Sequence, residues 1–180
     1  MTPRFRMIAG PNGSGKTTLC GRLSSEYSVN FYTMVNADSM FAEATKTRNL
    51  RMPVPVDADT FARHVSASSY PPEVLAPFRD GRILLDEDDF RFRTAGAVTT
   101  YTVSLIANFA QEAMIEAGQS FSQETVFSHP GKVDALRRAR SHGYRTYLYF
   151  YEDGRGFVHL STNLPVWFRD RVLAAAPRSC

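Results

Sequence analysis

The sequence predicts an α/β fold with a doubly wound parallel sheet, and two stretches of the chain predict it. The first, residues 4–36, runs strand, glycine-rich loop, helix, strand. The second, residues 98–151, alternates helical and strand-like patterns in the same way. Strands that alternate with helices typically form a parallel sheet with helices on its faces. We therefore expect a parallel sheet flanked by helices and interrupted by one insertion.

The opening elements follow from local composition. Residues 4–9, RFRMIA, have the apolar content of a buried first strand. Residues 15–26 predict a helix, and residues 29–36, VNFYTMVN, are rich in β-forming side chains and predict a second strand. A short helix is expected after Asp38. Strand, glycine loop, helix and strand in this order are the opening of a doubly wound α/β domain.

Residues 46–97 are expected to form a helical or irregular insertion, because Pro, Asp and Ser recur throughout them. Within this segment, residues 83–87, ILLDE, resemble the apolar strand with a terminal Asp-Glu pair of transport ATPases. Only three apolar residues precede Asp86, however, and the acidic residues continue through Asp89. No LSGGQ-type signature occurs in the chain. The run therefore predicts an exposed turn or an edge hairpin rather than a metal site.

The later elements have clearer boundaries. Residues 98–117 carry apolar side chains at helical spacing, and Gly118 is placed to end that helix. Residues 120–127 predict a strand, and residues 131–142 a helix. Residues 144–151, YRTYLYFY, form a continuous apolar strand of the kind that parallel sheets bury on both faces.

Length and composition predict one domain over residues 1–180, since 43% hydrophobic residues can build one core. No apolar run is long enough for a membrane span, and the glycine-rich loop interrupts any signal-peptide pattern, which predicts a cytoplasmic protein without a membrane partner. The net charge of +3 is modest and spread along the chain. It suits small anionic ligands as well as nucleic acid, but no basic run is interleaved with aromatic residues, so nucleic acid is not expected as a partner. Of the two cysteines, Cys20 is expected to pack.

The loop after the first strand carries the strongest motif of the chain. GPNGSGKTT matches G-x-x-x-x-G-K-[ST] at each fixed position, between a strand and a helix as that motif requires. Its glycines let backbone N–H groups face the β-phosphate of ATP, Lys16 reaches the β- and γ-oxygens, and the Thr17 hydroxyl binds Mg²⁺. The predicted ATP-binding residues are Gly10, Pro11, Asn12, Gly13, Ser14, Gly15, Lys16, Thr17 and Thr18.

Such a loop needs a carboxylate to order magnesium or to take a proton, and two candidates stand at strand ends. Asp38, in VNADSM, would project beside the γ-phosphate and could accept a proton from a substrate hydroxyl. Its alternative role is to cap a helix with Ser39. Glu124, in SFSQETVF, would contact ligand, magnesium or Lys16, unless it occupies an edge position. Either carboxylate could join Thr17 at magnesium through water.

These residues together resemble a known family. GPNGSGKTT, VNAD and GQSFSQETVFSHPGKVDALRRARSHGYRTYLYF are similar to the zeta-toxin family, in particular to its short bacterial members often labelled predicted ABC-type ATPases. The match covers residues 4–46 and 98–150. It implies a P-loop kinase, and the toxins proper phosphorylate the 3′-hydroxyl of UDP-N-acetylglucosamine. For this chain the acceptor and an antitoxin partner stay open.

The same resemblance implies roles for single residues. Asp38 falls where the family has its catalytic base, and Lys16 and Thr17 fall where it holds ATP and magnesium. Glu124 and Thr125 match the E-T motif that lines the substrate crevice.

The chain departs from the family after residue 151. The family continues with a T-E-D-P-E-like turn, a helix with two arginines and a G-G-H-x-V element, whereas this chain reads YEDGRGFVHLSTNLPVWFRDRVLAAAPRSC. Only Arg169 and Arg171 match the arginine helix, and the resemblance makes Arg171 a catalytic lid residue. We expect residues 152–180 to be a truncated or frame-shifted lid. Because lid arginines can contribute roughly 10³-fold in rate, such a chain would bind ATP and turn it over poorly.

Three functions are therefore compatible with the sequence. The leading one is a phosphotransferase that moves the γ-phosphate of ATP to a hydroxyl of a small molecule such as a nucleotide-sugar. The second is a nucleotide-binding or degenerate toxin-like protein with little catalysis. The third is a plain ATPase coupled to a partner machine, for which Asp86 and Glu87 would be essential.

Overall fold

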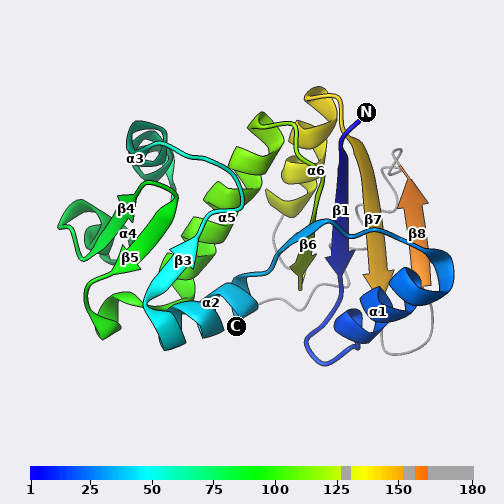
Figure 1. The fold of residues 1–180 in the computed structure, drawn as a ribbon, viewed down its shortest axis with the longest axis horizontal. Helices are drawn as coiled ribbons and strands as arrows, with labels where there is room; N and C mark the ends of the chain where they lie inside the picture. The colour runs from blue at the N-terminus through cyan, green and yellow to red at the C-terminus, as the bar shows by residue number, and fades with distance from the viewer. Residues whose placement is uncertain (127–130, 152–156, 162–180) are drawn as a thin grey trace. The chain divides into compact units, whose positions relative to one another are not determined.

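The computed structural model describes residues 1–126, 131–151 and 157–161. The chain divides into two compact units (Figure 1). Unit 1 combines Met1–Met34 with Gly118–Cys180, and unit 2 is Val35–Ala117. The expectation of a single domain over the whole chain stays a prediction. No helix in the described part of the chain has the length and apolar character needed to cross a membrane.

Unit 1 is built on a sheet with the strand order β2-β6-β1-β7-β8. The strands are β1 (Arg4–Ala9), β2 (Thr33–Val35), β6 (Phe121–Thr125), β7 (Arg145–Tyr151) and β8 (Phe157–Ser161). β1 runs parallel to both of its neighbours, β6 and β7, and four strands form the parallel part of the sheet. β8 is antiparallel to β7. The predicted parallel sheet is thereby confirmed.

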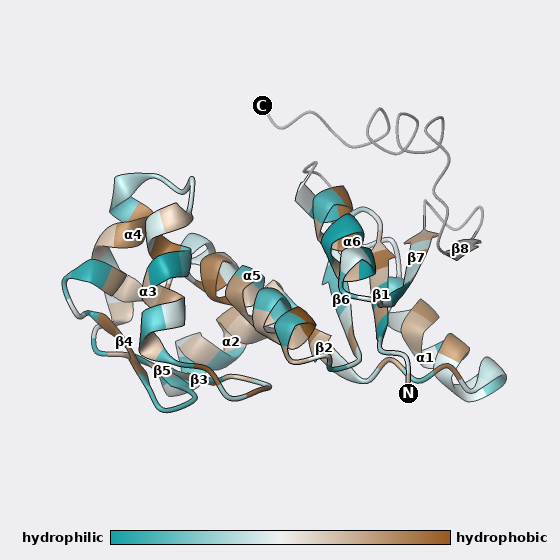
Figure 2. Cartoon of the chain, turned by 90° about the horizontal axis from the view of Figure 1, so that it is seen from above, coloured by the Kyte–Doolittle hydropathy of each residue, from teal (hydrophilic) through white to brown (hydrophobic). Residues whose placement is uncertain are grey.

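Helices cover both faces of this sheet. On one face, α1 (Lys16–Tyr27) places Leu23 in a buried cluster with Ile8, Phe31 and Tyr149. Figure 2 shows α6 (Gly131–Ser141) over the opposite face. There Phe5 and Phe121 stack with ring centroids 4.4 Å apart. Both helices lie within one residue of their predicted bounds, because each presents an apolar stripe at helical spacing.

Two features of the sheet differ from the prediction. The expected strand at residues 29–36 is only three residues long, because Tyr32 adopts a positive φ of 56° that breaks an extended chain. Its N–H donates to Asn30 Oδ1 at 2.7 Å, which makes a turn before β2. β8 lies beyond the last strand that the sequence predicted.

Unit 2 contains helices and a second, smaller sheet. Its three strands are antiparallel in the order β3-β5-β4. Phe61 packs against the rings of Phe78, Phe90 and Phe109 and forms the aromatic centre of the unit. The elements of unit 2 are α2 (Ala37–Thr47), β3 (Asn49–Arg51), α3 (Ala58–Ala67), α4 (Pro72–Arg79), β4 (Ile83–Asp86), β5 (Asp89–Phe92), a 3₁₀ turn η1 (Ala95–Ala97) and α5 (Thr100–Glu116).

Residues 46–97, expected as a helical or irregular insertion, lie within unit 2 and contain all three strands of its sheet. The prediction of helical or irregular structure is wrong for β3, whereas β4 and β5 form the edge hairpin expected at the acidic run. The apolar side chains of these strands alternate toward the core, as Leu50, Phe90 and Phe92 show. Alternation over three or four residues is too short to stand out among the prolines and acids around it.

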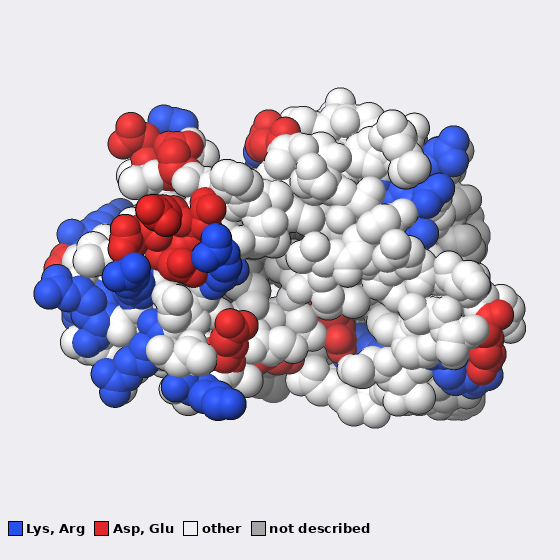
Figure 3. Space-filling model, viewed as in Figure 1, with Lys and Arg blue, Asp and Glu red and all other residues white. Residues whose placement is uncertain are grey.

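The acidic run ILLDE forms an edge hairpin, as predicted. β4 lies at one edge of the three-stranded sheet and turns at Glu87, with φ 52°, into β5. Asp86 forms an ion pair with Arg91 at 2.8 Å across the hairpin. Figure 3 shows acidic side chains gathered over this part of unit 2 with basic side chains around them. The carboxylates of the run are thus on the surface and partly neutralised.

Candidate functional site

The loop between β1 and α1 has the backbone conformation that its glycines predict. Gly10, Gly13 and Gly15 have φ values of 154°, 75° and 93°, a region that other residues rarely adopt. Ser14 N–H donates to Pro11 O at 3.2 Å and closes a turn inside the loop. The glycines therefore stand where the chain must curl back before the helix begins.

The first turn of α1 points unpaired backbone donors at this loop. The first hydrogen bond inside the helix runs from Leu19 N to Gly15 O at 2.9 Å. The N–H groups of Lys16, Thr17 and Thr18 consequently have no acceptor within the helix. Such N–H groups, reinforced by the helix dipole, favour an anion. The Thr17 and Thr18 side chains are exposed beside them.

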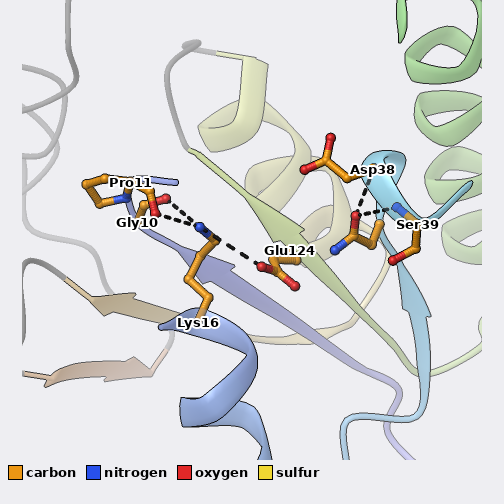
Figure 4. Close-up of polar contacts among 7 residues, drawn as sticks. Gly10, Pro11, Lys16, Asp38, Ser39 and Glu124 are labelled. Carbon is orange, nitrogen blue, oxygen red and sulfur yellow. Dashed lines mark hydrogen bonds and ion pairs between the residues drawn. The ribbon is translucent and has the colours of Figure 1, made fainter. Parts of the chain in front are cut away.

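Lys16 folds back over the loop and is only 7% exposed. Its Nζ donates to Gly10 O at 2.9 Å and to Pro11 O at 2.8 Å, as Figure 4 shows. An ammonium group has three donors, so two backbone carbonyls do not exhaust it. The lysine is thus held in place by neutral oxygens that an anion could replace.

Among the described residues, Glu124 places a carboxylate next to this ammonium. β6 pairs with β1 in the register Ile8↔Glu124, which brings the carboxylate to the same end of the sheet as the loop. Glu124 Oε1 lies 4.0 Å from Lys16 Nζ, and the side chain is 18% exposed. Of the three partners expected for Glu124, which were ligand, magnesium and Lys16, the structure shows Lys16. The alternative of an edge position is wrong, because β6 lies between β2 and β1.

Thr125 is tied to the loop through its backbone. Gly10 N–H donates to Thr125 O at 3.2 Å, immediately after the last paired residues of β1 and β6. The E-T pair at the end of β6 is therefore fixed beside the glycine loop. In an open α/β sheet, ligands bind outside the carboxyl ends of the strands. Whether Glu124 and Thr125 line an acceptor crevice stays a prediction.

The charge of Glu124 also reaches Cys20 on α1. Burial raises the pKa of the Cys20 thiol from 9.0 to about 11, and the Glu124 carboxylate is the second cause. Cys20 packs against the cluster formed by Ile8, Leu23, Phe31 and Tyr149, as expected from the sequence. The pKa of the Cys20 thiol therefore depends on the charge of Glu124, although Cys20 packs in the neighbouring apolar cluster and is not part of the site.

The hydroxyl groups of Ser14 and Thr17 indicate whether the loop suits phosphate and magnesium. Ser14 Oγ is buried and has no hydrogen-bond partner in the described part of the chain. A buried hydroxyl without a partner costs roughly 1–3 kcal/mol, and a phosphate oxygen would remove that cost. The Thr17 hydroxyl is exposed at the helix start, where Mg²⁺ on a bound phosphate would need a ligand. Within the described residues, no group of three or more His, Cys, Asp or Glu could hold a metal by itself.

Asp38 lies in unit 2, at the second position of α2. Asn36 caps this helix, because its Oδ1 accepts from Asp38 N at 2.8 Å and from Ser39 N at 3.1 Å (Figure 4). The alternative that Asp38 itself is the cap is therefore wrong. Its carboxylate is exposed and makes no hydrogen bond or ion pair with the described residues. An Asn before a helical pattern is a cap signal that the sequence offered.

The structure does not test the remaining roles that the sequence predicts. Arg169 and Arg171, together with the rest of residues 162–180, lie outside the described residues, as do residues 152–156. The role of Asp38 as base and that of Thr17 as magnesium ligand stay predictions.

Comparison with known proteins adds little to this geometry. No family model and no curated protein matches the chain. One solved structure similar to it is that of a protein from Chloroflexus aurantiacus described as a putative kinase, with 13% sequence identity and a TM-score of 0.42. The match covers 84% of this chain, which spans only 59% of the length of that protein. At this identity and TM-score, the likeness says nothing about activity.

Proposed function

We propose that this protein is a P-loop phosphotransferase that transfers the γ-phosphate of ATP to a hydroxyl of a small molecule. The observation that carries the proposal is the buried Lys16 ammonium, held by two loop carbonyls with Glu124 at 4.0 Å. A lysine at the start of a helix, below a glycine loop and beside a carboxylate from the neighbouring strand, suits the β- and γ-phosphates of a nucleotide.

Each loop group would have one task when ATP is bound. Lys16 would exchange the carbonyls of Gly10 and Pro11 for phosphate oxygens, since a charged acceptor binds an ammonium more strongly than a neutral one. The backbone N–H groups at the start of α1 would surround the β-phosphate. Thr17 and Glu124 would hold Mg²⁺, the latter through water, and the ion would neutralise developing charge on the phosphoryl group.

The acceptor side of the proposal rests on Asp38 and on the family resemblance. Asp38 would take the proton of the attacking hydroxyl, and its exposed carboxylate is available for that role. The resemblance to zeta toxins favours a nucleotide-sugar such as UDP-N-acetylglucosamine as acceptor, with Glu124 and Thr125 beside it. It also favours Arg171 as a lid residue and an antitoxin as a partner.

The alternative of a plain ATPase is less well supported. It needs Asp86 and Glu87 at the end of a strand in the same sheet as β1. Both instead belong to the edge hairpin of a separate antiparallel sheet, where Asp86 already pairs with Arg91.

The proposal is tested by incubating the protein with γ-labelled ATP, Mg²⁺ and a pool of bacterial nucleotide-sugars. Wild-type protein should label one of the sugars. Asp38→Ala should reduce acceptor-dependent ADP release by about 10²-fold or more and leave the affinity for ATP within about twofold, because general-base catalysis contributes in that range. Calorimetry and a coupled ADP assay measure the two quantities.

The chain offers a matched control for this variant. Asp59 occupies the same second position of helix α3 that Asp38 occupies in α2. Asp59→Ala should therefore leave transfer unchanged. Undiminished transfer by Asp38→Ala would reject the assigned base. Tight ATP binding without any labelled product would instead identify a nucleotide-binding protein with little catalysis.

A further inference from the structure

Three arginines gather at the amino ends of two neighbouring strands in unit 1. β1 and β7 pair in the register Arg4↔Arg145 and Arg6↔Tyr147. Partners in a parallel pair, and residues two apart on one strand, point to the same face of a sheet. Arg4, Arg6 and Arg145 therefore share the face on which Ile8 and Tyr149 pack against α1.

Aromatic rings and a carbonyl hold the central arginine of this group. The Arg6 guanidinium lies over the Tyr147 ring, 4.4 Å from its centroid, and 5.9 Å from that of Tyr32. Its Nε donates to Asn30 O at 2.9 Å. Arg6 is only 7% exposed. Because guanidinium is planar and weakly hydrated, stacking on rings can stabilise it where an ammonium would need oxygen ligands.

Arg4 keeps a donor without an acceptor. Its Nη1 donates to the Tyr32 hydroxyl at 2.9 Å. Its Nε is buried and has no hydrogen-bond partner in the described part of the chain. A buried donor of this kind is costly unless something accepts from it. The exposed Arg145 side chain lies at the neighbouring register position.

Among the described residues, no carboxylate pairs with these arginines. Other cations of the chain do form ion pairs. Like charges at opposite positions of neighbouring strands destabilise a sheet. A bound anion would remove that repulsion and accept from the spare donors.

We propose that Arg4, Arg6 and Arg145 form a second anion site, which binds phosphate groups at the amino ends of β1 and β7. Arginine forks match phosphate oxygens in a bidentate way. The site is distinct from the glycine loop, which follows the other end of β1, roughly 17 Å away at 3.3 Å per residue. The tyrosine rings are already stacked on Arg6, so the site contacts phosphate without stacking on a base.

The test uses inorganic pyrophosphate as the probe and the Lys16→Ala protein as the background, in which binding at the loop is strongly weakened. Calorimetry should show saturable binding in this background. Arg4→Gln combined with Arg145→Gln should weaken it by about tenfold or more, because two charged donors are lost. The matched control is Arg22→Gln with Arg137→Gln, which removes two exposed arginines that already have carboxylate partners.

Two results would overturn the site. One is the absence of pyrophosphate binding to the Lys16→Ala protein, and the other is equal loss in the two double variants. Arg145→Gln alone, at an exposed position, keeps the test valid should the Arg4 variant fail to fold. A failure here leaves the proposed kinase untouched, because ATP binding at the loop is measured separately.

A second experiment identifies which kind of molecule carries the bound phosphate groups. A fluorescent oligonucleotide of about 12 nucleotides is titrated at several salt concentrations. If the ligand is a nucleic-acid backbone, the oligonucleotide binds through the same arginines, displaces pyrophosphate and weakens steeply with salt. If it is a small phosphorylated molecule, pyrophosphate binds and the oligonucleotide does not compete. Competition that the Arg4 and Arg145 substitutions leave unchanged contradicts the proposal.

Discussion

The two ends of strand β1 carry buried cations that are held in different ways. At the carboxyl end, the Lys16 ammonium is held by the carbonyls of Gly10 and Pro11, with Glu124 at 4.0 Å. At the amino end, the Arg6 guanidinium rests on the ring of Tyr147 and one carbonyl. An ammonium is compact and strongly hydrated, whereas guanidinium is planar and can stack. Lys16 must therefore change partners to bind an anion, and the arginine end need not.

This comparison predicts different effects of the two substitutions on the free energy of unfolding. Arg6→Met should lower the free energy of unfolding by about 1–3 kcal/mol, because it removes a charged hydrogen bond and the stacking on Tyr147. Lys16→Met should change stability by less than about 1 kcal/mol or increase it, since functional sites are rarely optimised for stability. Urea denaturation monitored by circular dichroism measures both.

The exposed Arg137, paired with Asp134, provides the control for these variants. Arg137→Met should leave the urea midpoint almost unchanged, because surface ion pairs contribute about 0–1 kcal/mol. An Arg6→Met protein more stable than wild type would mean that the rings do not compensate the buried charge. The contrast between the two ends of β1 would then fail.

A smaller effect should appear at Cys20. In a Cys180→Ser background, Cys20 is the single thiol of the chain. Its pKa of about 11, raised first by burial and then by Glu124, leaves about a thousandth of the thiols ionised at pH 8. Glu124→Gln removes the second cause, so the pKa should fall while staying above 9.0, and alkylation at pH 8 should accelerate roughly two- to tenfold.

The alkylation rate is read by mass spectrometry over a series of pH values. Glu26→Gln is the control, because it removes the same charge from the last turn of α1, where Glu26 pairs with Arg22. Equal rates in wild type and Glu124→Gln would show that the Glu124 charge does not act on this helix.

Unit 1 could be predicted well from the sequence, for reasons that individual elements make plain. The continuous apolar residues 144–151 and the glycine loop leave few alternatives to a parallel sheet with a loop at its carboxyl edge. The same logic found Glu124, since a carboxylate on a buried strand needs a partner, and Lys16 is that partner.

The features that the sequence did not predict depend on the local backbone geometry or on pairing between strands far apart in the chain. The positive φ of Tyr32 shortens β2, and nothing in VNFYTMVN signals it. The strands of unit 2 are three or four residues long and pair across up to 42 positions, as Asn49 with Arg91 shows. Short strands of this kind acquire their structure from tertiary packing rather than from local propensity.

The central claim is that Lys16 exchanges its loop carbonyls for the phosphates of ATP. The most direct measurement is calorimetric titration of the wild-type protein, Lys16→Ala and Lys46→Ala with Mg²⁺·ATP. Lys46 is an exposed lysine of α2 and provides the matched control. We predict that Lys16→Ala weakens binding by about 100-fold or more, since a charged hydrogen bond contributes about 1.5–3 kcal/mol and two phosphates are contacted, and that Lys46→Ala binds like wild type. Equal affinities of Lys16→Ala and wild type would contradict the account.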